Sequence, residues 1–398
     1  MNPGPSISIN PTLLSWARSE SGYDVERVAH RLKVKEERVL AWETGELHPT
    51  TRQLQDLAQF LHRPMGVFFM PRPPQTPPLA AEYRRLPGVE VGHESPELRL
   101  ALRQMIARRE TTLNLLGEFG DTPVEFNIQA HLHESPATVG QRLREAVGIS
   151  LEAQQGWGDG WEAWREWRQA IENMGVLVFQ FAKVPLTEVR GLSLLRMPLP
   201  VAAINSKEIV PEARIFTVLH EVVHLMLAAG REEAPAAREP KHSEAWEQVE
   251  RFAENAAAHA LMPDALVQGL VQDHKLSRVD WTIDDIRGLA RRMRVTPLAT
   301  ATRLREGGFM TWDQYRRWRG EWEAIVSKLP ARAGGFATPV QKTIGRAGSP
   351  FVRLVLEVLD TGRITAVEAS RHLDLKFQHF ETLREKVAYG ANREAIGE

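Results

Sequence analysis

Apolar residues recur every three or four positions over most of this chain, which is the spacing of amphipathic α-helices. Short apolar and β-branched runs typical of strands occur only between residues 175 and 205. The pattern therefore predicts a mainly α fold with a small β-sheet. The helical stretches cover 11–61, 95–120, 248–262, 282–294, 311–328 and 349–390, and the strand candidates are 175–182, 189–195 and 199–205.

Breaks in this pattern predict four regions. Four short amphipathic stretches make residues 1–70 an all-α domain. Residues 71–95 contain six prolines and have no helical period, as expected of a stiff linker. Residues 96–330 combine the strand candidates with flanking helices and form an α+β domain. After the flexible "ARAGGFATP", residues 331–398 form a helical C-terminal region.

The amino-acid composition limits the possible partners and metal ligands but does not assign a function. The 398 residues include 50 basic and 51 acidic side chains, so the net charge of -1 gives no general argument for nucleic acid or a membrane surface. The absence of cysteine excludes disulfides and sulfur-ligated metals, which leaves nitrogen and oxygen ligands for any metal. The N-terminus does not resemble a signal peptide, and there is no apolar run of about 18 residues. We expect a cytoplasmic protein without a membrane partner.

The stretch "FTVLHEVVHLML" (216–227) holds three polar groups in a segment whose other residues predict a buried helix. His220 and His224 lie four positions apart, so they share one helix face and can bind a single ion. Glu221 lies about 100° round the helix, beside that ion, where it can take a proton from an attacking water. Two buried histidines and an acid would be costly to bury unless a divalent cation neutralised them.

A third ligand must come from elsewhere, and "EQVERFAENAAAHALMP" (247–263) is the best candidate. Glu250 and Glu254 share a helix face there, among small alanines that permit close approach. We expect Glu250 to bind the metal and Glu254 to accept the spare N–H of a ligating histidine. Glu247 is the alternative ligand, and a solvated helix face is the simpler explanation of the glutamate pair.

These segments, "ARIFTVLHEVVHLML", "VERFAENAAAHALMP" and the upstream "VAAINSK", resemble the ImmA/IrrE family of metallopeptidases over residues 160–300. The resemblance implies a zincin-like α+β domain that binds Zn²⁺, with Mn²⁺ as the alternative. It also implies that His220, His224 and Glu250 are metal ligands and that Glu221 is the catalytic base. Glu254 stands where the family has Asn or Asp, and Ala256 where it has Phe.

Other groups could help substrate binding. His242 and His259 are possible donors to the oxyanion, although each is more simply an ordinary polar residue. The strand candidate "LPVAAIN" (199–205) could accept the substrate backbone by strand addition.

The first region resembles the Xre/Cro-type helix-turn-helix in "DVERVAHRLKVKEERVLAWETGELHPT". The resemblance implies that the N-terminal residues of its second helix read DNA, with Lys35 and Arg38 as the basic contacts. Glu36 and Glu37 lie between them and would repel phosphates. Binding of duplex DNA and docking of a protein therefore both remain open. The stretch "ITAVEASRHLDLKFQHFETLRE" in the C-terminal region is either a second helix-turn-helix or a plain helical extension.

The combination predicts a regulator that performs limited proteolysis. The proteins that it resembles cleave transcriptional repressors, so the expected substrate is a repressor-like protein or the chain's own N-terminal module. The alternative is a DNA-binding or scaffold regulator whose peptidase-like domain senses a ligand or partner without cleaving it.

Overall fold

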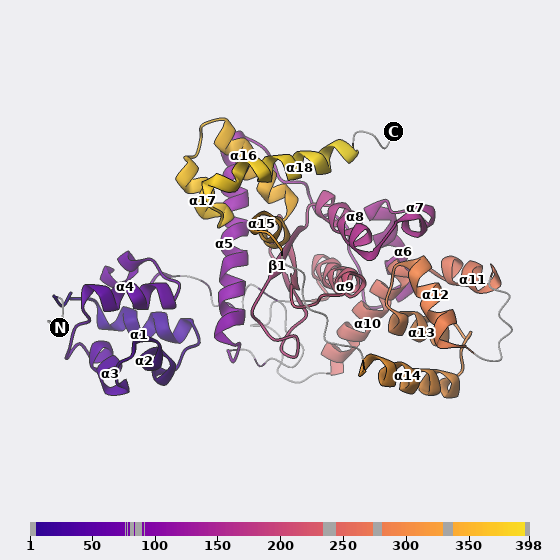
Figure 1. Ribbon diagram of the computed structural model, residues 1–398, viewed down its shortest axis with the longest axis horizontal. Helices are drawn as coiled ribbons and strands as arrows, with labels where there is room; N and C mark the ends of the chain where they lie inside the picture. Colours follow the sequence, from indigo (N-terminus) through magenta and orange to yellow (C-terminus); the bar gives the residue numbers. More distant parts are fainter. Residues whose placement is uncertain are drawn as a thin grey trace. The chain divides into compact units, whose positions relative to one another are not determined.

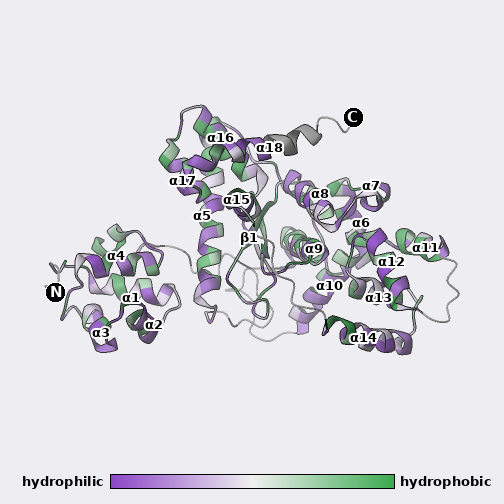
Figure 2. Cartoon of the chain, viewed as in Figure 1, coloured by the Kyte–Doolittle hydropathy of each residue, from purple (hydrophilic) through white to green (hydrophobic). Residues whose placement is uncertain are grey.

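The computed structural model describes residues 5–75, 77, 79, 83, 90, 92–233, 244–273, 281–328 and 337–394. Within these ranges the fold is mainly helical with one small β-sheet, which confirms the predicted fold class (Figure 1). Hydrophobic and hydrophilic residues alternate along α5 (Pro96–Phe119), as expected of an amphipathic helix (Figure 2). None of the described helices is long and apolar enough to cross a membrane.

The chain forms two compact units. The first consists of Met1–Ala81 and Gly88–Gln104, and the second of Glu82–Pro87 and Met105–Glu398. About half of the proline-rich segment 71–95 lies outside the described residues, and its predicted linker character is not tested.

The first unit begins with four α-helices around a small apolar core that includes Leu14, Val28 and Trp42. These helices and the short 3-10 helix that follows them are α1 (Pro11–Glu20), α2 (Val25–Leu32), α3 (Glu36–Thr44), α4 (Thr51–Phe60) and η1 (Met65–Phe69). Between α2 and α3, Lys33 adopts a left-handed conformation (φ 56°), and the Val34 N–H bonds to the Ala29 carbonyl at 3.0 Å. This turn gives α2 and α3 the form of a helix-turn-helix.

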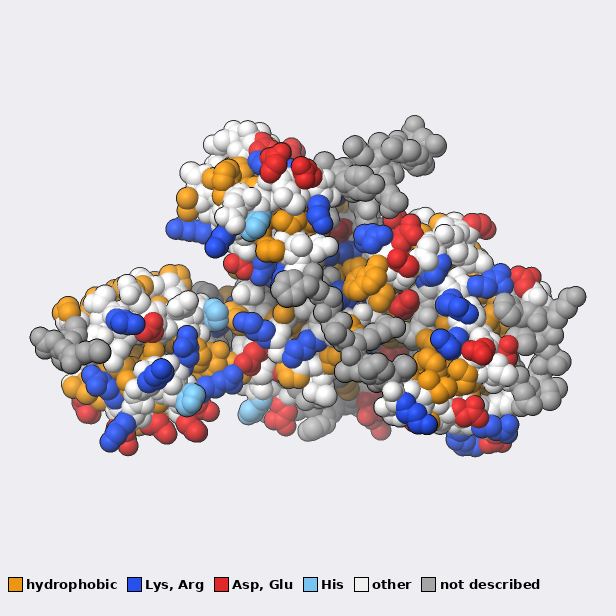
Figure 3. Space-filling model, in the orientation of Figure 1, with side chains coloured by type: hydrophobic (Ala, Val, Ile, Leu, Met, Phe, Trp, Pro, Cys, Tyr) orange, Lys and Arg blue, Asp and Glu red, His pale blue; other side chains and the backbone are white. Residues whose placement is uncertain are grey.

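Lys35 and Arg38 lie at the start of α3 and are both exposed, as a DNA-reading role requires. Acidic and basic side chains are nevertheless intermingled over the N-terminal unit on the face that Figure 3 shows. Residues 1–70 carry equal numbers of each, eight and eight by our count of the sequence. This balanced charge gives no electrostatic argument for DNA over a protein partner.

The sheet of the second unit has three buried strands, β1 (Leu177–Phe181), β2 (Gly191–Leu194) and β3 (Val201–Asn205). The strand order is β1-β3-β2, with β1 parallel and β2 antiparallel to β3. The central strand β3 therefore has a hydrogen-bonded neighbour on each side. Our expectation that residues 199–205 accept a substrate strand is wrong, because only an edge strand has free backbone groups.

Helix α9 (Pro211–Ala229) packs on this sheet and on α8 (Gly160–Asn173). It approaches β2 closely at Gly191, where an added Cβ would lie 2.5 Å from Thr217 Cγ2 and 2.7 Å from Glu221 Oε1. Helix α10 (Glu244–Leu261) packs on α9 and on α6 (Pro136–Val147). A Cβ on Gly140 of α6 would lie 2.6 Å from the Ala256 carbonyl oxygen, so the α6–α10 contact requires glycine.

The other described helices complete the second unit. They are α7 (Leu151–Gly156), α11 (Asp264–Asp273), α12 (Ile283–Met293), α13 (Pro297–Glu306), α14 (Trp312–Val326), α15 (Pro339–Ala347), α16 (Ser349–Asp360), α17 (Ala366–Leu373), η4 (Phe377–His379) and α18 (Phe380–Glu394). Helices α15 to α18 share an apolar core that includes Phe351, Leu373 and Leu383.

The turn that joins α2 to α3 is a helix C-cap with a left-handed residue, and several other described helices end in the same way, two of them at non-glycine residues that are followed by an apolar residue. Arg294 (φ 54°) lies between α12 and α13, and Asp374 (φ 46°) lies after α17. In each case the next residue is apolar and its N–H bonds back to the preceding helix, from Val295 to Ala290 at 3.0 Å and from Leu375 to Ser370 at 3.1 Å. Because the same cap ends helices such as α4 and α9, it does not decide between a second helix-turn-helix and a plain helical extension in the C-terminal region.

Candidate metal centre

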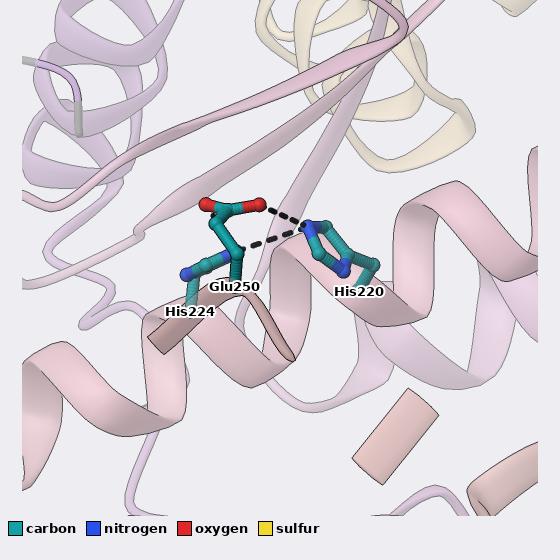
Figure 4. A group of neighbouring side chains, drawn as sticks. All are labelled: His220, His224 and Glu250. Atoms are coloured by element: carbon teal, nitrogen blue, oxygen red, sulfur yellow. Dashed lines mark hydrogen bonds and ion pairs between the residues drawn. The ribbon is translucent and has the colours of Figure 1, made fainter. Parts of the chain in front are cut away.

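Helices α9 and α10 bring His220, His224 and Glu250 together (Figure 4). The two Nε2 atoms are 3.0 Å apart, and each lies 3.5 Å from a carboxylate oxygen of Glu250. His224 is fully buried, whereas His220 and Glu250 each keep 13% of their side-chain surface exposed. One end of the group is therefore enclosed and the other can be reached by solvent.

The dimensions of this group fit a metal ion. Zinc–nitrogen and zinc–oxygen bonds of about 2.0–2.1 Å at tetrahedral angles would separate ligand atoms by about 3.3 Å, close to the observed 3.0 and 3.5 Å. Two histidines and one carboxylate are also a donor set of catalytic zinc sites, which keep a fourth position for water or substrate. The three residues could hold a divalent metal ion.

A second carboxylate fixes the orientation of His224. The Nδ1 of His224 lies 2.8 Å from Glu233 Oε2, and both side chains are almost completely buried. Because an ionised carboxylate only accepts hydrogen bonds, Nδ1 is the donor in this pair. A neutral His224 then has its lone pair on Nε2, which faces His220 and Glu250.

We expected Glu254 to make this contact, and the structure gives it to Glu233 instead. Glu233 lies three residues beyond the C-cap residue of α9, Gly230, after a reversal at Arg231 (φ 62°). Glu254 is exposed and lies one turn along α10 from Glu250. The alternative ligand Glu247 is not among the residues that the structure groups around the histidines. No periodicity in the sequence indicates Glu233, because it follows the helix rather than lying on it.

Glu221 lies beside the metal group and not in it. Its carboxylate accepts a hydrogen bond from Ser193 Oγ of β2 at 2.5 Å, and only 2% of the residue is exposed. The close approach of α9 to Gly191 allows this contact. Sequence reasoning missed Ser193, which is a buried polar residue in an otherwise apolar strand. A serine between apolar residues of a predicted strand is the signal that could have indicated Ser193.

Glu221, His220 and Glu250 line one cleft of about 730 Å³. Its walls come from the segment before β2, from α9 and α10, and from α13. The other lining residues are Leu186–Gly191, Glu212, Ala213, Phe216, Thr217, Glu254, Asn255, Ala258, Leu261, Met262, Val295, Thr296, Leu298, Ala299, Thr302, Arg303 and Glu306. The cleft is large enough for several side chains of a peptide.

Of the two possible oxyanion donors, His259 is described by the structure and does not line this cleft. His259 lines a different cavity, and its Nδ1 lies 3.0 Å from a guanidinium nitrogen of Arg303. Burial, together with the positive charge of Arg303, lowers the pKa of His259. His242 lies outside the described residues.

We expect Glu233→Gln to weaken metal binding about tenfold or more, because a neutral amide holds the Nδ1–H of His224 less strongly than a carboxylate. Competition titration with a zinc chelator measures the change. Glu232→Gln is the matched control, since Glu232 contacts His131 (3.1 Å) and no residue of the metal group. Equal affinities of the two variants would contradict the role of Glu233.

Comparison with known families agrees with this geometry. The model of Peptidase_M78, the IrrE N-terminal-like domain, matches residues 171–305. This range contains the three strands and helices α9 and α10, and therefore the whole metal group. No curated protein matches the chain. Residues 171–305 are thus a metallopeptidase-like domain. The match does not extend to the first unit or to the C-terminal helices, whose description rests on their geometry alone.

Proposed function

We propose that the chain is a zinc-dependent endopeptidase that performs limited proteolysis of a repressor-like protein or of its own N-terminal module. The observation that carries the proposal is the group of His220, His224 and Glu250 in an open cleft, with Glu221 beside it. The match to a metallopeptidase family supports the hydrolytic part. The helix-turn-helix geometry of the first unit supports a regulatory role in the cytoplasm.

Residues of the chain would hold the metal ion, transfer the proton and position the base. A zinc ion held by His220, His224 and Glu250 would polarise the scissile carbonyl and acidify the attacking water. Glu221 takes the proton from that water and passes it to the leaving amine. Ser193 holds the Glu221 carboxylate in place with a hydrogen bond of 2.5 Å.

The substrate backbone can bind along β2. This strand is at the edge of the sheet, where Leu194 at its end is bridged to Tyr83, and Gly191 at its start lines the cleft beside Glu221. An extended peptide that adds to an edge strand gains backbone hydrogen bonds independent of its sequence. Side-chain contacts in the cleft must then decide which bond is cleaved.

Incubation with candidate repressors tests the function. We expect the zinc-loaded protein to cut a repressor at one or a few sites, a chelator to abolish cleavage, and added Zn²⁺ or Mn²⁺ to restore it. The rival function is a DNA-binding or scaffold regulator that senses a ligand, favoured by the helix-turn-helix form of α2 and α3 in the first unit. A salt-dependent DNA complex without any metal-dependent cleavage would support the rival.

A further inference from the structure

We propose that Glu254 selects substrates with a basic side chain close to the cleaved bond. This inference rests on the proposed function, because it assigns the substrate preference of the same cleft. It gives Glu254 a role other than the support of a metal ligand that the sequence predicted. The substrate class is an exposed segment in which an apolar residue and a Lys or Arg lie near each other.

Two parallel rows of side chains form the floor of the cleft. Along α9, residues four apart place Glu212, Phe216 and His220 on one face, and all three line the cleft. Along α10, Glu250, Glu254 and Ala258 do the same. Since four residues rise about 6 Å along a helix, Glu254 and Phe216 lie one turn from the metal ligands. They are in reach of substrate residues next to the reacting carbonyl.

The charge in the cleft is negative once internal pairs are removed. Its two arginines are already paired, Arg190 with Glu208 at 2.8 Å and Arg303 with Asp264. Four glutamates line the cleft outside the catalytic group, at positions 188, 212, 254 and 306, and of these Glu212 and Glu254 form no ion pair with a described residue. A cationic side chain is therefore favoured and an acidic one is repelled.

Glu254 is the best placed of these four carboxylates. It is exposed, and no residue that the structure describes forms an ion pair or hydrogen bond with it. By contrast, Glu306 pairs with Arg305 at 2.8 Å. Glu254 can therefore bind a substrate cation without first breaking an internal contact, which an already paired carboxylate would have to do.

Apolar groups lie beside this carboxylate. The Phe216 ring stacks near the His220 ring, with centroids 6.4 Å apart, and Leu298 of α13 is 41% exposed. A half-buried phenylalanine and an exposed leucine in a cleft favour an apolar substrate residue. The cleft thus combines an apolar contact at Phe216 with an acidic one at Glu254, one on each of its two helices.

Peptide libraries that are degenerate except for one fixed Lys or Glu test the proposal. Mass spectrometry of the products from the zinc-loaded wild-type protein should show Lys or Arg enriched at one position beside the cut. We expect Glu254→Lys to lower kcat/KM for the Lys library about tenfold, mainly through KM, and to raise it for the Glu library. Glu247→Lys, an exposed site on the same helix outside the cleft, is the control and should change neither.

Binding measurements separate this inference from the proposed function. Fluorescence anisotropy with the Glu221→Gln protein reports peptide affinity without cleavage. Charge-selective binding that Glu254→Lys reverses, in a protein that cuts nothing, would leave the inference standing and refute the peptidase. Cleavage and binding that are equal for the Lys and Glu libraries, and unchanged in Glu254→Lys, would refute the inference and leave the peptidase intact.

Discussion

Glu221→Gln is expected to retain the metal and to lose cleavage by at least about a hundredfold, the lower range for removal of a general base. Glutamine has nearly the same shape and its amide oxygen can still accept the hydrogen bond from Ser193, now 2.5 Å from the carboxylate. Its neutral amide cannot take a proton from water. Metal content by mass spectrometry and single-turnover cleavage of the same sample measure both effects.

Two comparisons guard this result against simpler causes. Glu247→Gln makes the same chemical change at an exposed position of α10 and should cleave like the wild type. Thermal unfolding should be similar in both variants if the loss is chemical. A Glu221→Gln protein that cuts at the wild-type rate would exclude Glu221 as the base and require another proton acceptor in the cleft.

The sequence predicted the two histidines of the metal group, because helix periodicity is enough to place them on one face. His220 and His224 are four residues apart in a segment too apolar to be anything but a buried helix. Glu250 required one further step, since its helix had to pack on the first. The alanines and Gly140 that allow close packing of α10 are visible in the sequence, but which helices meet is not.

The support of the site could not be predicted in the same way. Glu233 reaches His224 only because the chain reverses after Gly230, through the positive φ of Arg231. Arginine is not a residue that indicates such a conformation. Glu254 had the right spacing on α10, but the structure exposes it in the cleft. The spacing of residues along one helix shows which of them share a face. It does not show which other part of the chain packs against that face.

The three strands illustrate the same limit. Each lies within its predicted range, because short apolar runs bounded by Gly, Pro and Asn are a local signal. The order β1-β3-β2 is not local, since β1 pairs with a strand that follows β2 in sequence. The outer strand beside the cleft is therefore β2, with Gly191 and Ser193, rather than the more apolar β3.

His220→Ala is expected to lose both metal and cleavage. Structural zinc sites with four protein ligands bind zinc with roughly 10–16 kcal/mol, which is about 3 kcal/mol for each ligand. Loss of His220 should therefore lower the metal affinity on the order of a hundredfold. The metal content of the purified protein should fall from about one ion per chain to a small fraction. His220 lies at the solvent-exposed end of the group, so the fold should survive the change.

His133→Ala is the control, because His133 is an exposed histidine outside the metal group. It should keep metal and activity. Metal loss in His220→Ala, set against metal retention in Glu221→Gln, separates binding from chemistry on adjacent residues of one helix. If His220→Ala instead kept its full metal content, the ion would have to be bound elsewhere. Glu221 would then have no activated water to deprotonate, and the cleft would be a binding site alone.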